Sequence, residues 1–355
     1  MGKAEAKARL SKHWDTFITQ DDVNQIAAAG LNFIRIDVGY WAVTPQEDEP
    51  YVTGQLEYLD KALDWARAAG LWVMVDLHGG KRTNQRLRWR TDKLAPGSQN
   101  GFDNSGHRGA IKWEKGNNVA QTVTAFNALA ERYASQTDVV AAIEALNEPF
   151  VPGGVSLATV KNYYHSAWDK LHQYSSDTTL ALHDAFQAPD SWNSFMVGPK
   201  WNVVIDDHHY EVFSRGALSM DINGHVGSVC SLANDHLVKG YHWTIVGEWS
   251  AALTDCTKYL NGKGIGARYD GSYSGGSAIG SCAGKVQGSA ASLSAEDKAN
   301  TRRWIEAQLD AYEKSDGWLF WTWKTEGAPG WDMQDLLAAG LFPNPPTDRQ
   351  YGPQC

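Results

Sequence analysis

The stretches AAGLNFIRI at residues 28–36 and AAGLWVMVD at residues 68–76 share one pattern of a helix end, a glycine and a short apolar strand. Glycine is the residue that most easily takes the left-handed backbone conformation that ends a helix. The strand that follows is apolar rather than alternating, which is typical of a parallel strand covered on both faces. A repeated unit of helix, glycine and strand is typical of a (β/α) array.

Five more apolar stretches predict strands, at residues 139–146, 178–182, 202–207, 243–246 and 318–323. Helical patterns lie between most of them, and strands that alternate with helices form a parallel α/β sheet. The total of seven is one short of the eight strands of a closed (β/α) barrel. At this point the strand count leaves an open sheet and a barrel as alternatives.

Composition excludes several classes of function. The 355 residues carry a formal net charge of −9, which argues against nucleic acid as a partner, because phosphate binding needs a basic face. No apolar run reaches the ~18 residues that a membrane span needs. Core packing accounts for most of the 16 Trp, 14 Tyr and 10 Phe, and the alternative, that some line a groove and stack on a flat apolar ligand face, leans weakly toward carbohydrate.

Cysteines and the amino terminus point to different compartments. The four cysteines, Cys230, Cys256, Cys282 and Cys355, are even in number and widely spaced. Two disulfides in an oxidising compartment suit this pattern, and four reduced thiols in a cytosolic chain remain an alternative. The first ten residues, MGKAEAKARL, have no apolar core, so no signal peptide is expected in this chain.

Two segments differ in composition from the rest of the chain. Residues 80–94 carry six basic residues and one acidic residue, which favours either a solvated basic loop or a phosphate-binding insert. Residues 257–293 are rich in Gly and Ser and predict a long loop region.

Polar residues gather at the carboxyl ends of the predicted strands, where the reactive groups of a (β/α) barrel converge. They are Arg35, Asp76, His78, Asn147, Glu148, His208, Tyr210, Glu248, Trp321 and Trp323. Each one alone has a structural explanation, such as an ion pair or a helix cap. Two glutamates at strand ends are harder to explain in this way, because buried carboxylates repel each other. A protonated and an ionised carboxyl across a pocket can break a glycosidic bond.

At these residues the sequence resembles glycoside hydrolase family five, and within it the fungal exo-β-1,3-glucanases. The resemblance rests on stretches that run in family order: RIDVGYWA (35–42), DLHG (76–79), APGSQNGFDNSG (95–106), LNEP (146–149), HDAFQ (183–187), DDHHY (206–210), GEWSAALTDC (247–256) and FWTWKTEGAPGW (320–331). It implies a retaining, exo-acting hydrolysis of β-1,3-glucan that releases glucose. It also implies a single (β/α)8 TIM-barrel domain over residues 1–355, with no metal and no organic cofactor.

The resemblance also implies a role for each site residue. Glu148 is the expected acid/base and Glu248 the expected nucleophile. The expected sugar-binding residues are Arg35, His78, Asn147, His208, Tyr210, Trp321, Phe102, Phe213, Phe186 and Asp103. Phe102 and Phe213 are expected to clamp the glucan at the pocket entrance. The expected disulfides are Cys256–Cys282 and Cys230–Cys355, in a monomer that is secreted or located in the cell wall.

Three departures accompany the resemblance. By comparison with the family, we expect this chain to lack the signal peptide and the first barrel strand that would precede Trp14, and this expectation accounts for a count of seven strands. The insert at residues 80–94 interrupts the family pattern and is interpreted as a retained intron or a gene-model error. Asp37 stands where the family usually has proline. The alternatives are therefore a β-glucanase of another linkage specificity and a catalytically impaired glycan-binding protein.

Overall fold

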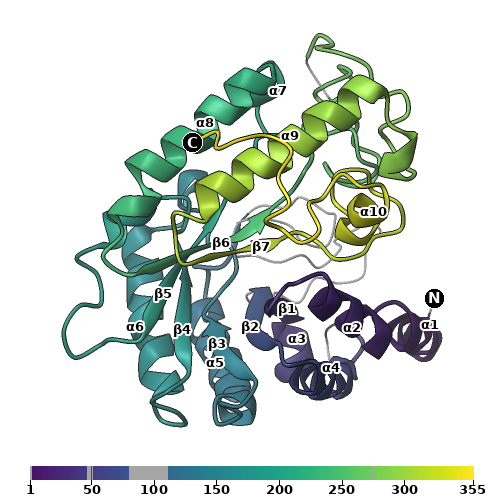
Figure 1. Cartoon of the computed structure of the whole chain (residues 1–355). Helices are drawn as coiled ribbons and strands as arrows, with labels where there is room; N and C mark the ends of the chain where they lie inside the picture. Colours follow the sequence, from purple (N-terminus) through teal and green to yellow (C-terminus); the bar gives the residue numbers. More distant parts are fainter. Residues whose placement is uncertain (1, 46–48, 50, 80–110, 274–275) are drawn as a thin grey trace. The chain divides into compact units, whose positions relative to one another are not determined.

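The computed structural model describes residues 2–45, 49, 51–79, 111–273 and 276–355 (Figure 1). The chain divides into two compact units. The first unit comprises Met1–Gln187 and Ser194–Ile205, and the second comprises Ala188–Asn193 and Asp206–Cys355. The basic segment at residues 80–94 lies outside the described residues.

The described part of the chain contains seven strands, and each lies where the sequence predicts one. They are β1 (Phe33–Gly39), β2 (Trp72–Gly79), β3 (Val140–Glu144), β4 (Thr179–His183), β5 (Val203–His208), β6 (Trp243–Trp249) and β7 (Gly317–Phe320). The strand order of the sheet follows the sequence. This order fits a TIM-barrel-like fold. The absence of a first barrel strand remains a prediction.

Parallel pairing sets the register inside each unit. In the first unit β1 pairs with β2, β2 with β3, and β3 with β4, all in parallel. The register places Asp37 beside Asp76, and Asp76 beside Glu144, so three carboxyl groups lie in a row across three strands. In the second unit β6 pairs in parallel with β7.

The helices of the first unit are α1 (Lys3–Thr16), α2 (Gln20–Ala28), α3 (Tyr40–Val43), α4 (Gln55–Ala69), α5 (Asn118–Tyr133), the 3₁₀ helix η1 (Val151–Gly153) and α6 (Leu157–Leu171). Two of them, α2 and α4, have clear end signals. Thr19 and Asp22 form a capping box at the start of α2, with the Thr19 amide donating to Asp22 over 2.9 Å. Gly70 ends α4 with a φ of 71°, in the left-handed region that favours glycine.

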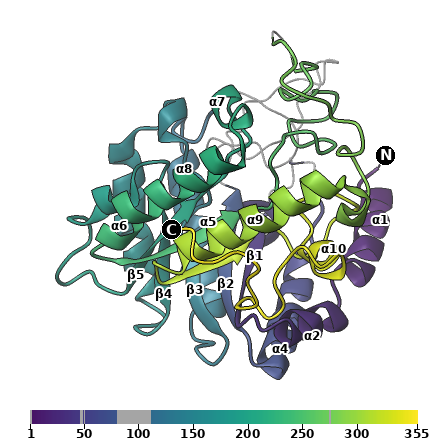
Figure 2. The same ribbon diagram turned by 45° about the horizontal axis from the view of Figure 1, so that its top comes forward.

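The two longest helices of the second unit, α8 and α9, lie side by side (Figure 2). The set is α7 (Arg215–Leu218), α8 (Ile222–Asp235), α9 (Ala295–Tyr312), α10 (Met333–Ala338) and the 3₁₀ helices η2 (Pro189–Trp192), η3 (Leu237–Lys239) and η4 (Ala290–Ser292). Ser294 caps α9, because its hydroxyl accepts a hydrogen bond from the Asp297 amide over 3.0 Å. Trp304, Ile305 and Leu309 on α9 are buried.

Both disulfides expected from the resemblance are present in the second unit. Cys230 bonds to Cys355, and Cys256 bonds to Cys282. The second bond joins Cys282, in the Gly/Ser-rich region at residues 257–293, to Cys256, which directly precedes that region. The described part of the region contains only one short helix, η4. No helix among the described residues is long and apolar enough to cross a membrane.

Candidate active site

Arg35 is the centre of the polar cluster in the first unit. It projects from β1, and its Nη2 lies 2.7 Å from Glu144 Oε2 and 3.0 Å from Asp76 Oδ2. The same nitrogen donates to Asn147 Oδ1 over 2.9 Å. Both carboxyl groups are fully buried, and a buried carboxylate is tolerated only when it is paired. Arg35 therefore compensates part of the buried negative charge and orients Asn147.

His78, from β2, is held between two carboxylates. Its Nδ1 lies 2.6 Å from Asp76 Oδ2 and 3.5 Å from Asp37 Oδ2. Burial alone lowers the pKa of His78, but the charges of Asp37 and Asp76 outweigh burial and raise that pKa to about 10. Burial likewise raises the pKa of Asp76, yet Arg35 and His78 hold it below its ordinary value. His78 is thus a cation at neutral pH.

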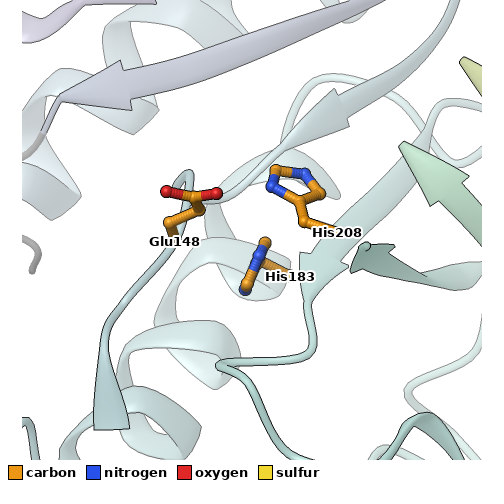
Figure 3. A group of neighbouring side chains, drawn as sticks. All are labelled: Glu148, His183 and His208. Carbon is orange, nitrogen blue, oxygen red and sulfur yellow. The ribbon is translucent and has the colours of Figure 1, made fainter. Parts of the chain in front are cut away.

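Glu148 follows directly after Asn147, in the segment that leaves β3. Its backbone has a φ of 46°, in the left-handed region that non-glycine residues rarely adopt. Such a conformation costs free energy and is often found at functional sites. Glu148 lies close to His183, the last residue of β4, and their polar atoms come within 4.8 Å of each other (Figure 3). Figure 3 also draws His208, the last residue of β5.

Phe186 lies in the loop after β4, in the same unit as Glu148. Its ring packs edge-on against Phe150, with the centroids 5.2 Å apart, and tilts against His183 at 5.0 Å. The Asp184 carboxylate accepts a hydrogen bond from the Phe186 amide over 2.7 Å, which fixes the loop. Phe186 is therefore placed near Glu148 by aromatic contacts with its neighbours.

Glu248, from β6, is a buried glutamate of the second unit. Tyr210 donates its phenolic O–H to Glu248 Oε2 over 2.9 Å, and His208 Nδ1 lies 3.6 Å from the same oxygen. The backbone is tied as well, because the His209 amide donates to the Glu248 carbonyl over 2.9 Å. One segment of chain, residues 208–210, therefore fixes both the carboxylate and the backbone of Glu248.

Gly247, the residue before Glu248, packs directly against the side chain of Asp206 on β5. A Cβ atom added to Gly247 would lie 2.0 Å from Oδ1 of the buried Asp206. Side-chain atoms do not approach to that distance, so any larger residue must displace Asp206 or the strand. The requirement for glycine at position 247 is therefore a matter of space.

Aromatic rings surround Tyr210 in the second unit. Trp331 stacks on the Tyr210 ring with the centroids 5.3 Å apart and an interplanar angle of 29°. Phe213 meets Tyr210 edge-on at 5.6 Å, and Trp321 packs against the same apolar cluster. Flat rings of this kind match the apolar faces of sugar rings.

Most of the predicted site residues fall into two groups, one in each unit. The first unit brings together Arg35, His78, Asn147, Glu148 and Phe186, and the second brings together His208, Tyr210, Glu248, Phe213 and Trp321. Phe102 and Asp103 lie outside the described residues. Their roles at the site remain predictions.

Three neighbours of the site were not predicted from the sequence: Glu144, His183 and Trp331. Glu144 had a usable signal, since a carboxylate inside an apolar parallel strand needs a buried cation. His183 and Trp331 lie inside the matching stretches HDAFQ and FWTWKTEGAPGW, but their contacts depend on packing.

One group in the first unit has the atoms to bind a metal ion. Polar atoms of Asp37, Asp76 and His78 lie within 4.8 Å of one another. Arg35 already supplies positive charge to this group, because it contacts both Asp37 and Asp76. The chemistry available here is therefore that of ion-paired acids and a cationic imidazole.

The parallel strands follow one another in sequence order and carry acids, amides and aromatic rings at their carboxyl ends. This arrangement is typical of a glycoside hydrolase of the TIM-barrel class. The sequence profile described as cellulase, glycosyl hydrolase family 5, matches residues 2–327. The chain belongs to glycosyl hydrolase family 5.

Fungal relatives resemble the chain over its whole length. A protein of Aspergillus niger named "Probable glucan 1,3-beta-glucosidase A" is 59% identical over 100% of this chain and 81% of its own length. A protein of Arthroderma benhamiae named "Probable glucan 1,3-beta-glucosidase" is 48% identical over 99% of this chain and 82% of its own length.

Solved structures share the fold at lower identity. A rutinosidase from Aspergillus niger is 17% identical and superimposes with a TM-score of 0.69, over 96% of this chain and 87% of that one. An endoglucanase of Pseudomonas stutzeri is 14% identical, with a TM-score of 0.56 over 92% of this chain and 86% of that one. At such identities the likeness extends to the fold alone.

Proposed function

We propose that this chain hydrolyses β-1,3-glucan from the chain end and releases glucose with retention of anomeric configuration. The substrate class follows from the fungal relatives, whose names state glucan 1,3-β-glucosidase and which match the chain over nearly its full length. Two disulfides fit an oxidising, extracellular compartment where such a polysaccharide is found. The observation that carries the chemistry is the carboxylate of Glu248, held by the Tyr210 phenol at the end of a strand.

Glu248 is the proposed nucleophile. A carboxylate that accepts a phenolic hydrogen bond is fixed in direction and keeps its negative charge, as a nucleophile must. One Glu248 oxygen attacks the anomeric carbon of the terminal glucose, and the bond to the leaving oxygen breaks. The product of this step is a glucosyl ester on Glu248.

Glu148 is the proposed acid/base. It protonates the leaving glycosidic oxygen in the first step, so that the shortened glucan departs as a neutral alcohol. In the second step the Glu148 carboxylate removes a proton from water, and the water oxygen attacks the anomeric carbon from the face opposite Glu248. The bond from that carbon to Glu248 breaks, which frees glucose and the Glu248 carboxylate. Two inversions give net retention, and both glutamates return to their starting protonation states.

The neighbours of the two glutamates are proposed to bind the terminal glucose. His78, as a cation, is proposed to donate to sugar oxygens. Arg35 fixes Asn147 beside it, with the Asn147 side-chain nitrogen 3.5 Å from His78 Nε2, and Asn147 is proposed to bind the same sugar. His208 contributes from beside Glu248, and Phe186 lines the pocket beside Glu148. Phe213 and Trp321, with Trp331 behind Tyr210, provide aromatic surface for the glucan.

Product analysis tests this proposal. The substrate is laminarin whose reducing ends have been reduced with borohydride, so that new reducing sugar comes only from cleavage. We expect glucose as the sole early product, formed first as the β-anomer in proton NMR, and little release from cellulose. A mixture of oligosaccharides at early times would indicate endo cleavage, and α-glucose as the first anomer would indicate inversion. Glu248→Gln serves as the inactive control.

A further inference from the structure

A second carboxylate, Glu211, lies just beyond the segment that fixes Glu248. It follows Tyr210 directly in the sequence, and it is 5% exposed. Its Oε1 is 3.2 Å from Nε2 of His209, and its Oε2 is 2.5 Å from Nδ1 of His225 on α8. Each carboxylate oxygen therefore has a different imidazole as its partner.

The protonation of this group follows from its contacts. Burial raises the pKa of Glu211, but hydrogen bonds from His209 and His225 outweigh burial, and the pKa falls to about 2. Glu211 is therefore ionised at any working pH and can only accept hydrogen bonds. Both imidazole nitrogens must then donate to it.

The contact between Glu211 and His225 on α8 is connected to Glu248 through the neighbouring residues His209 and Tyr210. His209 and Glu211 flank Tyr210, whose phenol donates to the Glu248 carboxylate. The His209 amide donates to the Glu248 carbonyl over 2.9 Å. Both contacts to Glu248 come from residues 209–211, and Glu211 joins this stretch to α8 through His225. His225 is itself held by packing against Trp304 on α9, with the ring centroids 5.4 Å apart.

We propose that Glu211, which joins His209 to His225, is a positioning residue that holds Tyr210 and the His209 amide in place against Glu248. This inference rests on the proposed role of Glu248 as the nucleophile. Glu211 does not touch the sugar; it determines how firmly the contacts to the attacking carboxylate are held. Positional errors of about 1 Å at a reacting group can cost ~100-fold in rate, so loosening this segment has a measurable effect.

Glu211→Gln is the direct test. The amide keeps the size of the side chain, but it replaces one acceptor oxygen with a donor that faces an imidazole N–H, so one of the two bridges is lost. With an aryl β-glucoside as substrate we expect kcat to fall about 10-fold while KM changes less than about 2-fold. A purely structural role predicts a lower melting temperature with kcat of the remaining folded enzyme unchanged, and that outcome overturns the proposal.

His225→Asn is a second variant, because it removes the same bridge from the side of α8. If Glu211 acts through His225, the double variant loses no more activity than the more affected single variant. Multiplied losses in the double variant would contradict the inference. His236→Asn is the matched control, since His236 lies just after the same helix and pairs with Asp190 over 2.9 Å, away from residues 208–211. We expect its kcat to stay that of the unaltered protein.

Glu248→Gln separates this inference from the function on which it rests. If Glu248→Gln keeps its activity, the proposed function is wrong whatever Glu211→Gln does. If Glu248→Gln is inactive and Glu211→Gln is fully active, only the positioning role of Glu211 is wrong.

Discussion

Tyr210 and Glu248 are joined by a hydrogen bond of 2.9 Å from the phenol to carboxylate oxygen Oε2, and the Tyr210 ring is stacked on Trp331. The phenol is thus fixed by ring packing on one side and directs its O–H to the carboxylate on the other. The packed aromatic rings therefore hold the phenol in place, and the phenol in turn fixes the carboxylate of the proposed nucleophile, Glu248.

Tyr210→Phe removes this hydrogen bond and keeps the ring. A hydrogen bond to a charged group contributes about 1.5–3 kcal/mol, so we expect kcat/KM on an aryl β-glucoside to fall roughly 10- to 100-fold. The melting temperature should change little, because the stacking on Trp331 is retained. Tyr241→Phe is the control, since Tyr241 is 71% exposed. Equal activity of both variants would contradict the role given to the phenol.

Arg35→Met tests the central ion pair of the first unit. It removes the cation that the buried carboxyls of Asp76 and Glu144 share and leaves Asp76 with His78 alone; breaking a buried pair in this way costs about 3–5 kcal/mol. Urea unfolding followed by circular dichroism measures the loss. Arg9→Ala breaks the exposed pair with Glu5 and should change the free energy of unfolding by less than about 0.5 kcal/mol. Similar losses of unfolding free energy in the two variants would show that Arg35 does not stabilise the buried cluster.

His78 should titrate far above its ordinary range. Its pKa is raised from 6.5 to about 10, so its pairing stabilises the fold fully below pH 6.5 and is lost as the pH rises through about 10. NMR titration of the His78 ring measures this pKa directly. Asp37→Asn removes one of the two carboxylates and should lower the pKa. A His78 that titrates near 6.5 in the unaltered protein would refute the assignment of a cation at neutral pH.

The two disulfides should differ in their contribution to stability. Cys230 and Cys355 are separated by 125 residues, and Cys256 and Cys282 by 26. Loop entropy then gives ~4.9 kcal/mol for the first and ~3.5 kcal/mol for the second. We expect the Cys230→Ala/Cys355→Ala protein to unfold at a lower urea concentration than the Cys256→Ala/Cys282→Ala protein. The opposite order would mean that the shorter loop stabilises the fold by its packing rather than by chain entropy.

Strands were predictable because parallel strands covered on both faces are apolar along their length, and this pattern is local. All seven lie at the predicted places, but the boundaries moved: β3 ends at Glu144 rather than at residue 146. After Glu144 the backbone still bonds to both neighbouring strands, from the Ala145 amide to the Ala181 carbonyl and from the Asn147 amide to the Leu77 carbonyl, but the regular strand ends earlier than the apolar run does. Such a departure depends on neighbouring strands and has no local signal.

Site residues were predictable where a motif carries them and not where packing selects a partner. Glu148 and Glu248 stand at strand ends within recognisable stretches, whereas the partner of Arg35, Glu144, is an acid inside an apolar run. The Glu211–His225 contact joins residues 14 positions apart through the packing of α8. Nothing in either local sequence indicates it.

Trapping of the covalent intermediate tests the central claim most directly. A 2-deoxy-2-fluoro-β-glucosyl fluoride carries a good leaving group, and its fluorine slows the hydrolysis of the ester, so the glucosyl–enzyme accumulates. Peptide mapping by mass spectrometry then locates the sugar. We predict one label per chain, on Glu248. A label on Glu148 or on any other carboxyl group would contradict the account.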